Sequence, residues 1–100
     1  MDVIFGDDDL DRLEVAPKFT GGRPPPVVKA YRKRMQTIRA APDERDFYKL
    51  KSLRFEKLGG KRSHQHSMRL NDQFRLILEL LKKDNPRGTV IKVVGIEDYH

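Results

Sequence analysis

The sequence has no cysteine among its 100 residues, which excludes disulfide bridges and thiolate metal ligands. It also has no apolar run near the roughly 20 residues that a membrane-spanning helix needs. The N-terminal residues 1–5 lack the basic start and long apolar stretch of a secretory signal. No glycine-rich phosphate loop, nucleophile elbow or internal repeat is found. We therefore expect a cytoplasmic protein with no membrane contact that folds by packing alone, as a single domain over residues 1–100.

Charge is abundant and unevenly distributed. Charged residues make up 36% of the chain and the net charge is +6, although the first 15 residues contain six acidic residues and one basic residue. Between residues 49 and 69 the only acid is Glu56. The basic residues of this segment are Lys49, Lys51, Arg54, Lys57, Lys61, Arg62 and Arg69. Such a cluster is typical of a surface that binds a phosphate backbone, and a merely solvated surface is the alternative.

The N-terminal half of the sequence predicts a short strand and two helices. Residues 3–5 are apolar, and the acidic residues 7–9 can cap and begin a helix that carries Leu10 and Leu13. The prolines at 24–26 can stand in the first turn of a second helix, where the backbone N–H groups have no partner. Apolar residues then recur at helical spacing: Val27, Tyr31, Met35 and Ile38.

The C-terminal half predicts a sheet. One further helical turn over 43–48 is expected first, anchored by Phe47 and Leu50. Beyond it the apolar period changes to two, which predicts strands over 53–58, 65–70, 73–80 and 89–96, with a turn at 84–88. The expected fold class is α+β, with two N-terminal helices packed on a mainly antiparallel C-terminal sheet.

The turn near Asn71 fixes a register. A three-residue loop over 71–73 pairs Met68 with Leu76 and Arg69 with Arg75. One face of the hairpin is then wholly apolar, and burial should select this register over the two-residue alternative. Because like charges directly opposite each other are destabilising, the two arginines should attract an anion between them.

The histidines give no clear metal signal. Zinc needs three or four ligands, and His64 and His66 have no cysteine or convergent third histidine with them. The strand pattern places His66 on the apolar face of its strand, as a packed or edge residue. We expect no metal and no cofactor.

Three segments together resemble a known family. They are Phe55-Glu56-Lys57-Leu58-x-Gly60, the run Ser67-Met68-Arg69-Leu70-Asn71-Asp72-Gln73-Phe74-Arg75-Leu76, and the terminal Glu97-Asp98-Tyr99-His100. This combination resembles the HigB killer proteins of bacterial toxin–antitoxin modules, within the RelE/ParE superfamily. The resemblance implies a RelE-like fold and a ribosome-dependent messenger RNA endonuclease that works without metal by attack of the ribose 2′-hydroxyl. It also implies neutralisation by a HigA-type helix-turn-helix antitoxin in a heterotetramer.

The resemblance also implies the site residues. It assigns catalysis to Arg75, Asp98, Tyr99 and His100, with His100 as general acid or base. Contact with RNA in the ribosomal A site is assigned to Lys57, Lys61, Arg62 and Arg69. Many relatives have a histidine where Glu56 stands and a lysine where Gly59 stands; Glu56 is then a candidate second acid or base, and Lys57 or Lys61 can supply the missing charge.

Two other functions remain open at the level of sequence. One is a non-catalytic toxin of the ParE type that targets DNA gyrase. The other is a basic nucleic-acid-binding module, for which uniform loss of affinity with salt and no cleavage would be diagnostic.

Overall fold

The computed structural model describes residues 1–82 and 88–98. The helices are α1 (Asp8–Val15), α2 (Pro25–Ala40) and α3 (Arg45–Lys49), with 3-10 turns η1 (Lys51–Leu53) and η2 (Gly60–Arg62). The strands are β1 (Val3–Phe5), β2 (Glu56–Lys57), β3 (Gln65–Arg69), β4 (Phe74–Lys82) and β5 (Thr89–Asp98). In the predicted turn at 84–88, residues 84–87 lie outside the described residues. No helix of the described chain is long and apolar enough to cross a membrane.

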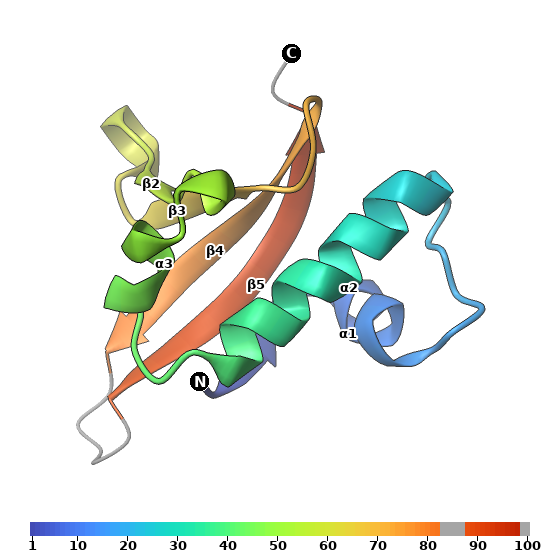
Figure 1. Ribbon diagram of the computed structural model, residues 1–100, viewed down its shortest axis with the longest axis horizontal. Helices are drawn as coiled ribbons and strands as arrows, with labels where there is room; N and C mark the ends of the chain where they lie inside the picture. The colour runs from blue at the N-terminus through green and yellow to red at the C-terminus, as the bar shows by residue number, and fades with distance from the viewer. Residues whose placement is uncertain (83–87, 99–100) are drawn as a thin grey trace.

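The strands form one sheet with the order β1-β5-β4-β3-β2 (Figure 1). All neighbours are antiparallel except β1, which runs parallel to β5 and pairs Ile4 with Lys92. The prediction of an α+β fold with a mainly antiparallel sheet is confirmed. The parallel docking of the N-terminal strand is a feature that periodicity alone does not reveal.

The helices cover one face of this sheet. Helix α1 begins as expected, since the Asp7 side chain accepts a hydrogen bond from the Asp9 N–H. All four apolar residues predicted for the buried side of α2 are buried, and they pack in one cluster with Leu76 and Leu78 of β4. Tyr31 of α2 is fully buried, and its hydroxyl donates a hydrogen bond of 2.7 Å to the Leu10 carbonyl of α1.

The predicted hairpin register is confirmed. Met68 lies opposite Leu76, and Arg69 lies opposite Arg75. The Asn71 side-chain oxygen fixes the turn by accepting hydrogen bonds from the backbone N–H groups of Gln73 and Phe74, at 2.9 and 2.8 Å. Met68 and Leu76 are therefore in the core, while the two arginines lie on the face opposite the helices, here called the open face.

Two local expectations are wrong. The strand predicted over 53–58 shrinks to β2, because Leu53 ends a 3-10 turn and Arg54 takes a left-handed conformation with φ 46° and ψ 52°. Phe47 is buried as expected, but Leu50 is 46% exposed and is not a buried anchor. The left-handed residue turns the chain away from the extended path that its alternating pattern suggested.

A β-bulge interrupts the pairing of β4 with β5. Leu78 lies opposite Val93, whereas the preceding residue of β4, Ile77, lies opposite Gly95, so Val94 is the extra residue. From this point onward the bulge reverses which residues of β5 face the core. Glu97 consequently lies opposite Arg75 on the open face.

Candidate anion site on the open face

The open face of the sheet holds a small, strongly basic pocket of about 120 Å³, here called the arginine pocket. Its lining residues are Arg54, Glu56, Ser67, Arg69 and Arg75. The lining thus combines three arginines with one glutamate and one serine. The sheet supplies four of these residues and the left-handed turn before β2 supplies Arg54.

The pairing of three adjacent strands assembles the pocket. Glu56 of β2 lies opposite Ser67 of β3, and Arg69 of β3 lies opposite Arg75 of β4. Ser67 and Arg69 share the open face because side chains of a strand alternate. Ser67 is only 5% exposed, so its hydroxyl belongs to the floor of the pocket rather than its rim.

A further arginine adds positive charge behind the pocket. Arg34 of α2 donates a hydrogen bond of 2.8 Å from Nε to the Arg69 carbonyl. Burial, and then the nearby charge of Arg69, lower the pKa of Arg34 from its ordinary value. Arg69 itself forms an ion pair with Asp72 in the turn. The pocket therefore lies in a region where cations are crowded together, which favours a bound anion.

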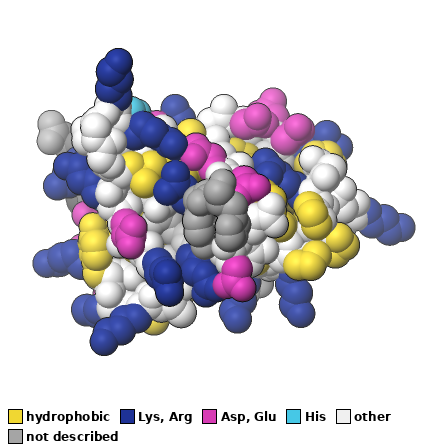
Figure 2. Space-filling model, turned by 90° about the horizontal axis from the view of Figure 1, so that it is seen from above, with side chains coloured by type: hydrophobic (Ala, Val, Ile, Leu, Met, Phe, Trp, Pro, Cys, Tyr) yellow, Lys and Arg dark blue, Asp and Glu magenta, His cyan; other side chains and the backbone are white. Residues whose placement is uncertain are grey.

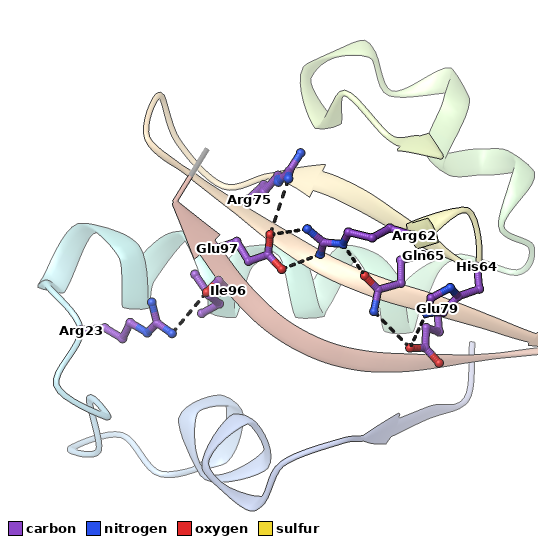
Figure 3. Close-up of polar contacts among 8 residues, drawn as sticks. All are labelled: Arg23, Arg62, His64, Gln65, Arg75, Glu79, Ile96 and Glu97. Carbon is purple, nitrogen blue, oxygen red and sulfur yellow. Dashed lines mark hydrogen bonds and ion pairs between the residues drawn. The ribbon is translucent and has the colours of Figure 1, made fainter. Parts of the chain in front are cut away.

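Glu97 joins the arginine pocket to a second group of polar residues (Figure 3). Its carboxylate accepts two hydrogen bonds from Arg62, at 2.9 and 2.5 Å, and lies 3.5 Å from an amino nitrogen of Arg75. The hydrogen bonds from Arg62, and the charges of Arg62 and Arg75, hold the pKa of Glu97 below its ordinary value. Glu97 is thus an ionised carboxylate shared between two guanidinium groups.

The same network continues along the open face. Arg62 donates from Nε to the Gln65 side-chain oxygen at 2.9 Å, and Gln65 donates to Glu79 at 3.3 Å. Glu79 lies 4.0 Å from His64 (Figure 3). Among the described residues, no group of three histidines or carboxylates is arranged to hold a metal ion.

His66 is packed, as the strand pattern predicted. Its ring stacks on Phe55 with centroids 4.9 Å apart and planes 11° apart. Burial, and to a smaller extent the charge of Lys57, lower the pKa of His66 from its ordinary value. At neutral pH this histidine is an uncharged part of the core edge.

The structure brings three of the predicted site residues together in the arginine pocket. Glu56, Arg69 and Arg75 line the arginine pocket. Lys57 is exposed and pairs with His66, on the opposite face of β2 from Glu56. Lys61 is exposed in η2, and Arg62 is bonded to Glu97 and Gln65. Asp98 lies opposite Phe74 in the sheet and accepts a hydrogen bond from Gln73. Tyr99 and His100 lie outside the described residues.

Three residues of the site had no role assigned from sequence. Ser67 could have been found, because it precedes Arg69 by two positions and must share its face. Arg54 was only one member of a basic run, and its left-handed backbone has no sequence signature. Glu97 faces Arg75 only because of the bulge, and its main partner Arg62 is 35 residues away in the chain.

The arginine pocket is suited to a phosphate group. Guanidinium groups make two parallel hydrogen bonds to phosphate oxygens, and three of them can neutralise the charge of a phosphodiester while it is being displaced. Lysine and arginine side chains are also spread over much of the surface seen in Figure 2, where a polyanion could extend beyond the pocket.

The arrangement of helices on a five-stranded, mainly antiparallel sheet is the toxin fold of the RelE/YoeB/ParE type. A solved structure with this fold is a YoeB/ParE toxin from Agrobacterium tumefaciens, which is similar to this chain with a TM-score of 0.59 and 12% sequence identity, covering 100% of each chain. At this level of identity the similarity establishes a shared fold. No protein-family model matches the chain. No curated protein matches it either.

Proposed function

We propose that this chain, as one domain of residues 1–100, is the toxin of a type II toxin–antitoxin module and cleaves messenger RNA on the ribosome, in the manner of HigB proteins. The observation that carries the proposal is the arginine pocket, which Arg54, Arg69 and Arg75 line together with Glu56 and Ser67. The toxin fold of the RelE/YoeB/ParE type supports it. The HigB-like sequence segments support it independently, since Glu56, Arg69 and Arg75 belong to both the segments and the pocket.

The proposed reaction is attack of a ribose 2′-hydroxyl on the neighbouring phosphate, with release of the 5′-oxygen. It requires a base, an acid and cations for the charge on the phosphate. Arg75, with Arg69 and Arg54, stabilises that charge. His100 transfers a proton, because an unperturbed imidazole titrates near neutral pH. Glu56 is the candidate for the other proton transfer.

The other assignments follow the same proposal. Asp98 orients or tunes His100, and Tyr99 stacks on a base or moves a proton. Lys57 and Lys61 contact the RNA backbone in the A site of the ribosome, whereas Arg62, which the resemblance groups with them, is bonded to Glu97. The protein acts in the cytoplasm with neither metal nor cofactor, and a HigA-type helix-turn-helix antitoxin neutralises it in a heterotetramer.

The test is induced expression followed by mapping of message ends by primer extension. Wild type should generate new ends in translated messages. Arg75→Ala should lower the cleavage rate by about 10²-fold or more, as loss of a transition-state donor does. His100→Ala should lower it by roughly 10²-fold or more if His100 transfers a proton. Arg45→Ala is the matched control, because Arg45 is 83% exposed and pairs only with the neighbouring Asp43 among described residues.

Circular dichroism melts of the purified variants separate loss of catalysis from loss of folding. Absence of new message ends with wild type, together with inhibition of gyrase in a supercoiling assay, would replace the proposal by a ParE-type toxin. Salt-sensitive RNA binding without cleavage on or off the ribosome would leave only a nucleic-acid-binding module.

A further inference from the structure

Arg62 and Glu97 form a two-point bridge on the open face. Arg62 donates from Nε to Gln65 and from both amino nitrogens to Glu97. All three nitrogens of this guanidinium are therefore occupied by partners within the chain. Three of the five N–H donors of this guanidinium are thereby used within the chain, which leaves fewer for a ligand in the adjacent pocket.

The bridge spans the sheet. Gln65 belongs to β3 and Glu97 to β5, and β4 lies between them. The Arg62 guanidinium therefore passes over β4 between the pairs Gln65–Glu79 and Arg75–Glu97, at the level of Ile77. Ile77 lies on the open face, away from the helices, yet its side chain is 0% exposed. The bridge thus ties η2 to the last strand and closes this part of the open face.

The bridge ends beside Arg75. Arg75 faces Arg69 directly across the hairpin, and repulsion between the two guanidinium groups favours conformations in which Arg75 swings away. Glu97 opposes this tendency, because its carboxylate lies 3.5 Å from Arg75 while Arg62 holds it from the other side. Arg75 is accordingly only 27% exposed and lines the pocket.

We propose that Glu97 is a positioning residue that fixes the Arg75 guanidinium in the arginine pocket, and that Arg62 acts by holding Glu97 rather than by touching RNA. The predicted effect of Glu97 on the cleavage rate rests on the proposed function. The predicted effect of Glu97 on the mobility of Arg75 is independent of the proposed function. Glu97 is poorly suited to carry a proton itself, because both of its oxygens accept hydrogen bonds from Arg62.

The first experiment observes Arg75 without any reaction. Arginine Nε–H signals in ¹⁵N NMR report whether a guanidinium is fixed. The Arg75 signal, assigned by its absence in Arg75→Lys, should be sharp in wild type and broadened in Glu97→Gln and Arg62→Ala. Glu79→Gln is the matched control, since it removes one negative charge from the same face and alters contacts with Gln65 and His64 rather than with Arg62 or Arg75. An unchanged Arg75 signal in Glu97→Gln would overturn the proposal.

The second experiment measures ribosome-bound cleavage. Glu97→Gln and Arg62→Ala should each lower kcat by about 10-fold to 100-fold, as displacement of a catalytic group by ~1 Å does, with KM changed little. The double variant should be no slower than the worse single variant, because the two side chains act as one unit. Glu97→Asp, which keeps the charge, should recover part of the rate, and Glu79→Gln should resemble wild type. Wild-type kcat in Glu97→Gln would overturn the proposal.

The third experiment distinguishes positioning from direct contact. The salt dependence of binding to a single-stranded RNA oligonucleotide should keep its wild-type slope in Arg62→Ala, whereas Arg69→Ala should reduce the slope by about one phosphate contact. A reduced slope in Arg62→Ala would show that Arg62 touches RNA and would overturn its positioning role. If wild type fails to cleave at all, the proposed function fails, while the NMR and salt measurements still decide the role of Glu97.

Discussion

Arg54 offers a sharp test of the arginine pocket, because its backbone conformation favours glycine whereas its place in the pocket requires the arginine side chain. Its φ of 46° lies in the left-handed region, where residues with a Cβ are strained by about 1–2 kcal/mol. Its side chain lines the pocket beside Arg69 and Arg75. Strain retained at a candidate site suggests that the side chain is needed there.

Two substitutions separate these demands. Arg54→Ala and Arg54→Gly both remove the guanidinium, but only glycine relieves the left-handed strain. Relief of about 1–2 kcal/mol, less the roughly 0.5–1 kcal/mol entropy cost of glycine, leaves Arg54→Gly about 0.5–1 kcal/mol more stable than Arg54→Ala. For a domain of this size, 1 kcal/mol corresponds to a change in Tm of about 4–8 °C.

Thermal melts measure the first effect and salt-dependent RNA binding measures the second. Both variants should lose the same affinity, and the salt slope of each should fall by about one contact. If Arg54→Ala melts at or above the temperature of Arg54→Gly, the strain argument is wrong. If both variants bind RNA as wild type does, Arg54 is not part of an anion site.

Two further predictions concern the core. Tyr31→Phe removes the buried hydrogen bond to the Leu10 carbonyl, so it should lower the free energy of unfolding by about 1–3 kcal/mol. Urea titrations measure this change. An unchanged unfolding midpoint would mean that the carbonyl finds another partner. The pKa of His66 is lowered in the folded protein, so the unfolded chain binds more protons and stability falls as the pH drops below the ordinary histidine value of 6.5. Between pH 7.5 and pH 5.5, wild type should therefore lose more of its Tm than His66→Gln, and parallel losses would contradict the stated burial of His66.

Most of the fold could be predicted from local sequence patterns. The acidic cap at Asp7, the helical spacing from Val27 to Ile38 and the hairpin around Asn71 each depend on residues close together in the chain, and each is confirmed. The hairpin register also placed Arg69 beside Arg75 correctly, because a one-residue slip would have buried charge.

The missed features depend on backbone geometry or on distant partners. Nothing in the identity of Arg54 indicates a left-handed residue, so the strand over 53–58 was overestimated. The contact between Arg62 and Glu97 joins segments 35 residues apart and depends on the bulge at Val94. The parallel pairing of β1 with β5 joins the two ends of the described chain, where neither segment specifies its partner.

The extra residue at Val94 gives the last strand two independent halves. In the half before it, Ile91 and Val93 pack against the helices. In the half after it, Ile96 faces the core and Glu97 faces the open side. If Val94 were instead paired as an ordinary strand residue, Ile96 and Glu97 would exchange environments, whereas deletion of Val94 would keep Ile96 inward and Glu97 opposite Arg75. The last strand can therefore lose one residue at this position without exchanging its two faces, so the length of the chain can vary here during evolution while the site is kept.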